Sequence, residues 1–420
     1  MMTMRWSPSI VCDQKVNSYS KWGLLLGLYT TQTIGISFFV VSLVAILRSR
    51  GMAFDKLSTV YLLGMVWPFK FLWASWVDRI AFGRWGHYRG WMLLMQAGML
   101  IVFGLMMCFD AVADFWVVYT LCFLMAMLSA TQDIAVDATA CQILDWKQRG
   151  FGNGIQIAGG LLGNLIGAGL VLVVYDWLGW VGSLAVMMMV TAMTFIQLLF
   201  YQEQWVPLPK PLTRWSIWSQ LSALWQSTAG KSWLALLLML PIGSSLAYAL
   251  ITPILVDKGW ALERIGFFVN VLGSSVGVLS AFFTGWLIAR VPRHRILVVS
   301  AGIQMIGIVA ITLPVLGYTD ELSVALSVVL YFACYNPAAT ILSTMMMDRV
   351  SHTSPGAQYT LQFSVKTFFS IGMISVGTAL IGPLGYGGVL ILSLAFGLLA
   401  LMICFAYIEA IGSSTSSSKN

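Results

Sequence analysis

Apolar residues along this chain fall into twelve long runs separated by shorter polar segments. A helix needs about 20 mostly apolar residues to cross a bilayer, so each run can span it, and the longest must include turns at the interface. The runs cover residues 22–47, 57–77, 91–109, 115–144, 152–175, 179–201, 232–256, 263–289, 296–317, 321–347, 357–382 and 386–409. The pattern predicts an all-α membrane protein with twelve transmembrane helices, and the even number places both termini on one side of the membrane.

The distribution of Lys and Arg predicts which side that is. Most of the 23 Lys and Arg residues lie in segments that are cytoplasmic when the N-terminus is inside. The exceptions on the exterior side are Arg48, Arg50, Lys56, Lys258 and Arg264. Because cytoplasmic loops carry an excess of Lys and Arg, both termini are predicted to be cytoplasmic.

The composition agrees with this class and excludes several others. Hydrophobic residues make up 59% of the chain and charged residues only 9%, whereas a soluble domain carries about 25% charged residues. The net charge of +7 is spread over short loops, so no nucleic-acid partner is expected. The six Cys and three His are scattered without metal-ligand spacing, so no metal and no cofactor is expected. No nucleotide-binding motif or nucleophile–base pair occurs, so we expect neither an enzyme nor an ATP-driven pump.

One long polar connection interrupts the pattern, between the sixth and seventh runs. It carries three prolines and then a Trp-rich stretch, which predicts a stiff exit followed by an amphipathic helix at the cytoplasmic interface. We therefore predict an N-terminal six-helix half (1–201), a cytoplasmic linker (202–231) and a C-terminal six-helix half (232–420).

Two carboxylates lie inside the fourth run. Asp133 and Asp137 are four residues apart and so share one face of a helix. A charged side chain at the centre of a membrane helix costs about 2.5–3.5 kcal/mol, so such residues usually face a partner, water or a ligand. Small residues surround the pair, which lets neighbouring helices approach closely. The pair is either a proton or substrate site in a transport pathway, or a polar knot that holds helices together.

Two lysines lie within predicted spans at a similar depth. Lys70 is about 12 Å inside the cytoplasmic end of the second helix, and Lys366 is similarly placed in the eleventh. One lysine could neutralise an aspartate while the other awaits an anionic ligand; alternatively, both extend to the interface. Uncharged polar residues within the spans are further candidates for ligand contacts, or for contacts between helices: Gln32, Gln132, Gln362 and Asn336.

The two halves carry similar charge patterns in equivalent loops. The relevant positions are Asp78, Arg79, Arg84, Arg89, Asp145 and Arg149 in the first half, and Arg290, Arg293, Arg295, Asp348 and Arg349 in the second. Parallel six-helix repeats of this kind are the architecture of major facilitator transporters. We expect the six residues of the first half to form a cytoplasmic gate; the alternative is that they only set topology.

Two sequence blocks resemble a known branch of that superfamily. The stretch WASWVDRIAFGRWGHYRGW from Trp73 to Trp91 is similar to the loop between helices 2 and 3 of major facilitator permeases. Its Asp78-Arg79 and Arg89-Gly-Trp91 resemble the AmpG-type branch, which includes muropeptide permeases and acetyl-CoA transporters. Ala130-Thr-Gln-Asp133 with Asp137 is similar to that branch's ATQD-x-x-x-D pattern. The chain departs from the general loop pattern at Ala74, where many facilitators have Gly.

A narrower resemblance is to the RhtX/FptX group of siderophore permeases. It rests on the short chain and on Gly27-Leu-Tyr29-Thr-Thr-Gln32, and it adds Tyr29 to the candidate pathway. It implies a monomeric transporter of the bacterial inner membrane that uses protons to import a siderophore or an iron–siderophore complex. Muropeptide and acyl-CoA transport are the alternatives. A membrane ligand sensor is the non-transport alternative, but this would need a large soluble output domain.

Overall fold

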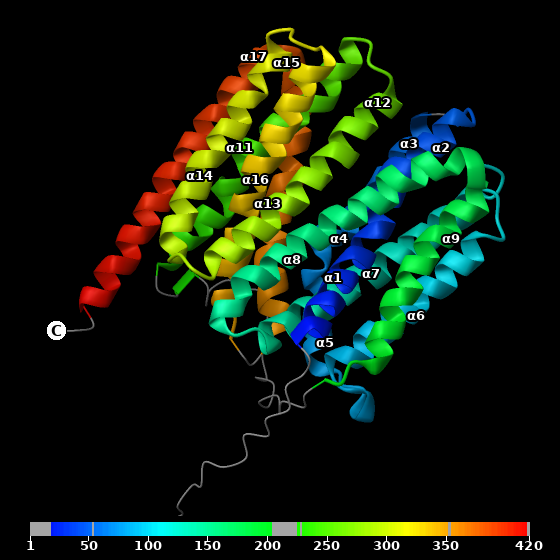
Figure 1. Cartoon of the computed structure of the whole chain (residues 1–420), viewed down its shortest axis with the longest axis horizontal. Coiled ribbons are helices and arrows are strands. Elements are labelled where there is room, and N and C mark those ends of the chain that lie inside the picture. The colour runs from blue at the N-terminus through cyan, green and yellow to red at the C-terminus, as the bar shows by residue number, and fades with distance from the viewer. Residues whose placement is uncertain (1–17, 53, 204–224, 227–228, 352–353, 418–420) are drawn as a thin grey trace, which may run out of the picture.

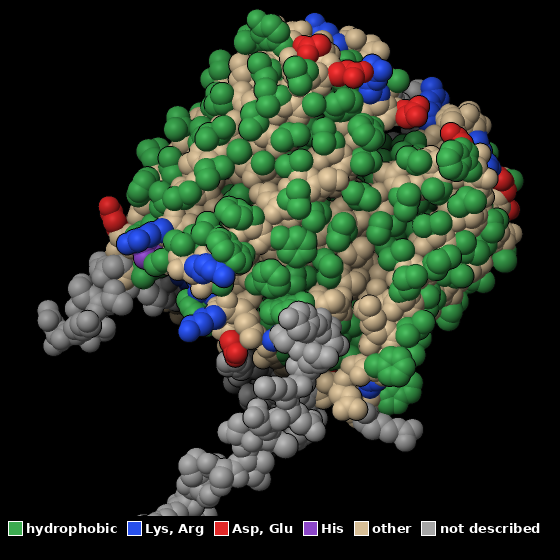
Figure 2. Space-filling model, in the orientation of Figure 1, with side chains coloured by type: hydrophobic (Ala, Val, Ile, Leu, Met, Phe, Trp, Pro, Cys, Tyr) green, Lys and Arg blue, Asp and Glu red, His purple; other side chains and the backbone are tan. Residues whose placement is uncertain are grey.

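The computed structural model describes residues 18–52, 54–203, 225–226, 229–351 and 354–417, and in these ranges all regular structure is helical. The helices form two groups that lie side by side, one from each half of the chain (Figure 1). Hydrophobic side chains cover the visible lateral face, whereas charged side chains gather at its two ends (Figure 2). This distribution is that of a protein surrounded by lipid.

The first group contains helices α1 to α9, with three short π or 3₁₀ segments inside its spans. Its elements are α1 (Ser18–Ser37), η1 (Phe38–Leu43), α2 (Val44–Ser49), α3 (Phe54–Tyr61), η2 (Leu62–Met65), α4 (Val66–Phe69), α5 (Phe71–Arg79), η3 (Gly83–Trp85), α6 (Tyr88–Met106), α7 (Phe115–Ile143), α8 (Trp146–Asn164), η4 (Leu165–Leu170) and α9 (Val171–Phe200).

The second group contains helices α11 to α17. Its elements are α11 (Gly230–Asp257), α12 (Leu262–Gly266), η5 (Phe267–Leu272), α13 (Gly273–Ile288), α14 (Arg293–Ala310), α15 (Thr312–Val315), α16 (Glu321–Asp348) and α17 (Pro355–Ser417). The predicted linker falls largely outside the described residues, so its amphipathic segment and the boundaries of the two halves stay predictions.

Two helical stretches are too long to be single spans. Residues 146–200 and 355–411 form stretches of 55 and 57 residues, about 80 Å each, against about 30 Å for a bilayer core. Each is broken at a glycine with positive φ, Gly179 (φ 61°) and Gly385 (φ 68°), where the chain reverses. With these breaks, and with the bent helix pair on either side of Lys70 taken as one span, the described chain has twelve spans. The predicted fold class is confirmed.

The second span bends by 50° between α4 and α5, and Lys70 is the residue at the bend. Pro68 explains the bend, because a proline inside a helix lacks an N–H and clashes with the preceding turn. The backbone around Lys70 forms i to i−3 hydrogen bonds, as in a 3₁₀ helix. The N–H of Lys70 donates to the carbonyl oxygen of Trp67 at 3.4 Å, and the N–H of Trp73 donates to that of Lys70 at 3.3 Å.

Glycines let the two groups touch backbone to backbone along α8 and α13. A Cβ on Gly154 would lie 2.8 Å from the carbonyl oxygen of Ala281, and a Cβ on Gly285 would lie 2.9 Å from that of Gly150. Small residues at such positions are what allows close approach of membrane helices. At these glycines the backbones of α8 and α13 approach each other closely, so the two helices form a tight contact between the halves (Figure 1).

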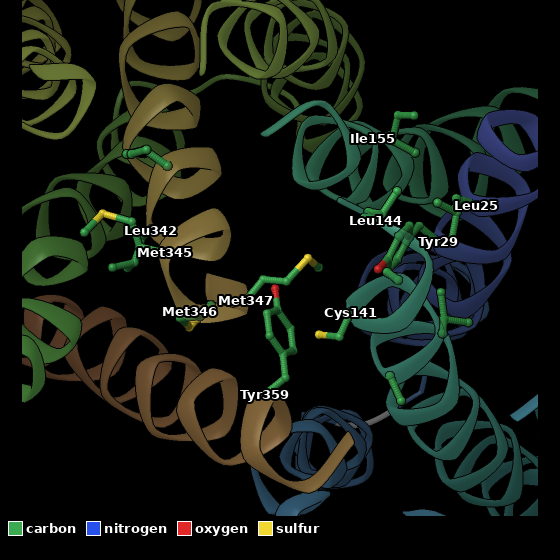
Figure 3. Packing of buried hydrophobic residues seen from close by; sticks show 14 of the residues in the cluster. Leu25, Tyr29, Cys141, Leu144, Ile155, Leu342, Met345, Met346, Met347 and Tyr359 are labelled. Carbon is green, nitrogen blue, oxygen red and sulfur yellow. The ribbon is translucent and has the colours of Figure 1, made fainter. Parts of the chain in front are cut away.

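The largest buried cluster of the hydrophobic core is shared by both halves and lies at the predicted cytoplasmic ends. It joins residues of α1, α7 and α8 to residues of α16 and α17. In Figure 3, Tyr359 of α17 lies between Met347 of α16 and Cys141 of α7. Toward the predicted exterior, the fully buried residues of each half form a cluster of their own. Contact between the halves continues there along α8 and α13, where Asn164 Nδ2 donates to Ser274 Oγ at 3.1 Å.

The predicted orientation can be tested with single cysteines at exposed positions. Asp176→Cys and Asp320→Cys are expected to react with a membrane-impermeant maleimide added to intact cells. Lys147→Cys and Arg295→Cys are expected to react only after permeabilisation. All six native cysteines are replaced in these variants. The reverse labelling pattern at either pair would contradict the orientation.

Candidate functional site

A buried ion pair lies at the centre of the first half. The Lys70 ammonium contacts Oδ2 of Asp133, and both side chains are almost fully buried. Oδ1 of the same carboxylate accepts a hydrogen bond of 2.6 Å from Nε2 of Gln32. Both oxygens of Asp133 therefore have strong donors, and the charge of Lys70 is neutralised within the protein.

Asp137 lies one turn away but has different partners. Its Oδ1 accepts hydrogen bonds from Tyr29 Oη (3.0 Å) and Gln156 Nε2 (2.8 Å). Its Oδ2 is buried and has no hydrogen-bond partner among the described residues. No ion pair of the described chain includes Asp137. Of the two carboxylates, this one has an unused oxygen and no cation in contact.

Lys366 approaches the same region from the second half. Its Nζ lies 4.6 Å from the ring centroid of Phe363, and Nζ of Lys70 lies 4.3 Å from the same centroid. A phenyl ring attracts a cation through its negative face, so Phe363 lets two ammonium groups share one neighbourhood. Lys366 is surrounded by protein, its side chain is partly exposed, and no ion pair of the described chain includes it.

The other predicted pathway residues are placed elsewhere. Gln132 donates to the Leu28 carbonyl oxygen (3.2 Å) and to Thr31 Oγ1 (3.4 Å), which ties α7 to α1. Gln362 accepts from Trp233 Nε1 (2.9 Å), and Asn336 donates to the carbonyl oxygen of Phe332 (2.7 Å) on its own helix. The structure does not bring the side chains of Gln362 and Asn336 to the charged residues.

Asp78 joins the two halves at the predicted cytoplasmic side. Its carboxylate accepts hydrogen bonds from the backbone N–H groups of Gly356 (3.1 Å) and Ala357 (2.8 Å), in the first turn of α17. Tyr88 Oη adds a third hydrogen bond of 2.8 Å. The free N–H groups and the dipole of a helix N-terminus favour a negative charge there, so Asp78 of one half caps a helix of the other.

A second connection centres on Asp348 of α16. Arg149 of α8 contacts its Oδ1 at 3.1 Å, and Arg293 of α14 contacts its Oδ2 at 2.6 Å. Arg293 also donates to the carbonyl oxygen of Trp146 (2.6 Å) and lies over the Trp146 ring. Two arginines from different halves thus share one carboxylate.

Three of the six predicted gate residues, Arg79, Asp145 and Arg89, form no hydrogen bond or ion pair with Asp78 or Asp348 in the described part of the chain. Arg79 and Asp145 are exposed, and no ion pair of the described chain includes either. Arg89 donates to the carbonyl oxygens of Leu198 and Leu199, within the first half. Arg84 lies in η3, and its side chain is outside the description.

The loop that carries these arginines also holds His87. Its Nε2 lies 2.8 Å from the carbonyl oxygen of Val77. Burial lowers the pKa of His87, so the imidazole is neutral at neutral pH.

Sequence reasoning missed three residues that contact the charged groups or their partners. These are Gln156, Tyr359 and Phe363. Tyr359 Oη donates to Gln156 Oε1 at 2.8 Å. Gln156 had a signal, because Gly154-Ile-Gln156 recurs as Gly356-Ala-Gln358 in the second half. Tyr359 and Phe363 had none, because an aromatic residue in an apolar run looks like core.

Two six-span groups that enclose a buried charged site and close over it at one end define a membrane transport protein. Residues 16–375 match the Major Facilitator Superfamily, and the chain belongs to that superfamily of multi-pass membrane transporters. The sensor alternative is set aside, since the family consists of transporters.

Comparison with known proteins adds a narrower likeness. The anhydromuropeptide permease of Escherichia coli K12 is 26% identical over 362 residues, which cover 83% of this chain and 72% of that protein. An uncharacterized protein of Haemophilus influenzae is 27% identical over 303 residues, 68% of this chain and 69% of that protein. Homologues of the AmpG type are thus found, as the sequence blocks predicted. The prediction of a siderophore permease finds no support in these comparisons.

Solved structures share the fold at low identity. The human organic anion transporter MFSD10 (TETRAN) superposes with a TM-score of 0.72 at 13% identity, over 93% of this chain and 100% of that one. A bacterial homologue of the iron transporter ferroportin in an outward-facing state gives 0.67 at 16% identity, over 93% and 99%. At these identities the likeness shows the fold alone.

The Lys70–Asp133 pair allows a stability prediction. Lys70→Met leaves the Asp133 carboxylate buried beside only Gln32, which is expected to cost about 3–5 kcal/mol. The double variant Lys70→Met/Asp133→Asn removes both charges and is expected to recover most of that loss. The melting temperature of the purified protein in detergent measures both effects, with exposed Lys258→Met as the matched control. A double variant less stable than Lys70→Met would contradict this account.

Proposed function

We propose that this chain uses the proton gradient to import anionic, sugar-containing peptides of the muropeptide class across the bacterial inner membrane. The observation that carries the proposal is Lys366, which forms no ion pair with the described residues and interacts electrostatically with Asp137, whose Oδ2 accepts no hydrogen bond from them. The likeness to the E. coli anhydromuropeptide permease supports the substrate class. Both termini are proposed to be cytoplasmic, and the transporter is proposed to act as a monomer.

Asp137, rather than Asp133, is proposed to carry the proton. Asp133 is held ionised by Lys70 and Gln32, because protonating it would leave a buried lysine without a counter-ion. Asp137 forms no ion pair with the described residues. Its Oδ2 accepts no hydrogen bond from them, so a proton on this oxygen would displace no donor. Two aspartates one turn apart on the same helix thus take different roles through their surroundings.

The charges near the site connect proton binding to anion binding. Lys70, Asp133, Asp137 and Lys366 sum to zero when all are ionised. A proton on Asp137 leaves one positive charge in excess, and Lys366 then attracts an anionic group of the substrate. By linkage, a bound anion favours the proton to the same degree. One proton and one anionic group together restore neutrality.

Polar and aromatic side chains extend from Lys366 toward the predicted exterior. Ser370, one turn after Lys366, lies 2.7 Å from Ser245 Oγ of α11. Three residues further along α11, the Tyr248 ring is 6.0 Å from the Tyr331 ring of α16, which stacks on Tyr335 at 5.8 Å.

The side chains of Tyr248 and Tyr335 are partly exposed, so they can contact a bound molecule. A site lined by aromatic rings with a few placed polar groups is typical of small-molecule binding. The cation, the hydroxyls and the rings fit the carboxylates, amides and sugar rings of a muropeptide.

The proposed coupling is tested with Asp137→Asn, which keeps the shape and removes the proton. In membrane vesicles with an acid-outside gradient, the wild type is expected to accumulate labelled anhydromuropeptide, and a protonophore is expected to abolish this. Asp137→Asn is expected to lose accumulation while retaining exchange without a gradient. Asp176→Asn, an exposed aspartate, serves as the control.

Two results would count against the proposal. Normal accumulation by Asp137→Asn would exclude this proton site. Uptake of a labelled ferric siderophore in the same vesicles, without muropeptide uptake, would move the assignment to the siderophore alternative.

The role of Lys366 is tested by its neutral variant. Lys366→Gln is expected to raise KM for the anionic substrate roughly tenfold or more, since charge-assisted hydrogen bonds contribute about 1.5–3 kcal/mol. Lys366→Arg is expected to retain most of the affinity, and exposed Lys258→Gln is the control. An unchanged KM in Lys366→Gln would show that the anion binds elsewhere.

A further inference from the structure

A hydrogen-bonded chain connects Asp137 to the other half of the protein. Tyr359 Oη of α17 donates to Gln156 Oε1 of α8 at 2.8 Å, with Asn153 Oδ1 of the same helix as a second, more distant acceptor at 3.3 Å. Gln156 Nε2 donates to Asp137 Oδ1 at 2.8 Å. Tyr359 and Asp137 are fully buried, and Gln156 is nearly so. The Asp137 carboxylate thus reaches the second half through one amide.

The direction of this chain is fixed by the charge on Asp137. An ionised carboxylate only accepts hydrogen bonds, so Gln156 must turn its NH₂ group toward it. The Gln156 carbonyl then faces Tyr359, whose hydroxyl must donate. Hydrogen bonds to a charged acceptor are about twice as strong as neutral ones, and bonds in a chain polarise one another.

Tyr359 sits at the end of α17 that closes the predicted cytoplasmic side. The first turn of that helix contains Gly356 and Ala357, whose N–H groups bind Asp78 of the first half. The hydrogen bond from Tyr359 to Gln156 and those from Gly356 and Ala357 to Asp78 therefore attach the same end of α17 to the first half.

We propose that Gln156 is a coupling residue, which transmits the charge of Asp137 to Tyr359 and so to the closure of the cytoplasmic side. The inference rests on the proposed function, in which Asp137 takes up the transported proton. A proton on Asp137 removes the negative charge, weakens both hydrogen bonds of the chain and favours opening to the cytoplasm. Loss of the proton there restores the bonds and closes this side again.

Other titratable or charged groups also face Asp137 or lie near it. They are Tyr29 of α1, Lys70 at the α4–α5 bend, Lys366 of α17, and Asp133 and Cys141 of α7. Lys70 and Asp133 neutralise each other. Asp78 and Asp348 titrate in the closing contacts themselves, so the experiment must separate their effect from that of Asp137.

The test measures closure directly and needs no substrate. Spin labels at Lys147→Cys and Arg295→Cys report the distance between α8 and α14 at the cytoplasmic ends, in the full chain with its six native cysteines replaced. Arg293 donates to Trp146, so these label sites are neighbours when this side is closed. Distance distributions are recorded in nanodiscs from alkaline to mildly acidic pH.

In the wild type, acidification is expected to raise the ratio of open to closed protein about fivefold. This factor corresponds to the difference in strength between a hydrogen bond to a charged acceptor and one to a neutral acceptor. Asp137→Asn is expected to show, at every pH, the ratio of open to closed protein that the wild type shows at acidic pH. Tyr359→Phe, which removes one hydroxyl, and Gln156→Leu are expected to lose the pH step. Tyr119→Phe, which removes a hydroxyl bonded to Thr59 within the first half, is expected to keep it.

Each contrary result has a distinct meaning. A pH step that survives in Tyr359→Phe and Gln156→Leu overturns the coupling role alone and leaves proton transport by Asp137 intact. A step that survives in Asp137→Asn assigns it to Asp78 or Asp348 and overturns the coupling role. A wild type without a step overturns both the coupling role and proton control by Asp137. A wrong substrate assignment changes none of these distances.

Discussion

The ion pair between Lys70 and Asp133 is the interaction on which the rest of the site depends. It puts two opposite charges where lipid surrounds the protein, and neither is tolerable there without the other. The bend at Pro68 places the lysine in reach, and Gln32 of α1 satisfies the second carboxylate oxygen. Three spans of the first half are thereby fixed around one neutral centre. Because Lys70 and Asp133 neutralise each other, the proposed protonation of Asp137, one turn away, does not leave either of them without a counter-ion.

The fold could be predicted from the sequence because its signals are local. Twelve apolar runs give twelve spans, and the breaks at Gly179 and Gly385 fall at or between the ends of predicted runs. Charged residues in apolar runs are conspicuous, so the four that the structure places in one region could be picked out from the sequence. The sequence could not say which lysine pairs with which aspartate, because both aspartates lie on the same helix face and both lysines at a similar depth.

The remaining site residues depend on information that is not local. Gln156 and Gln362 look alike in sequence, but helix rotation turns one toward Asp137 and the other toward Trp233. Tyr359 contacts Gln156 only because the two halves meet. Two of the six predicted gate residues, Asp78 and Arg149, find partners across the interface, whereas Arg79 and Asp145 are exposed. A gate role for any of the six stays a prediction. The prediction of a siderophore permease is not supported by the comparisons. It rested on chain length and on a resemblance over six residues, and neither of these describes a binding surface.

The glycine contact between α8 and α13 has a mechanical consequence. Side chains that interlock across a helix pair resist rotation, because each must leave its rotamer before the helices can move. Here Gly150, Gly154 and Gly285 present no side chain where the two backbones meet, although the Phe151 and Phe282 rings pack beside them with their centroids 6.2 Å apart. Fewer side chains therefore have to change rotamer when the two helices shift against each other than in a fully interlocked pair. The hydrogen bonds and ion pairs at the cytoplasmic ends then contribute a larger share of the resistance to such a shift.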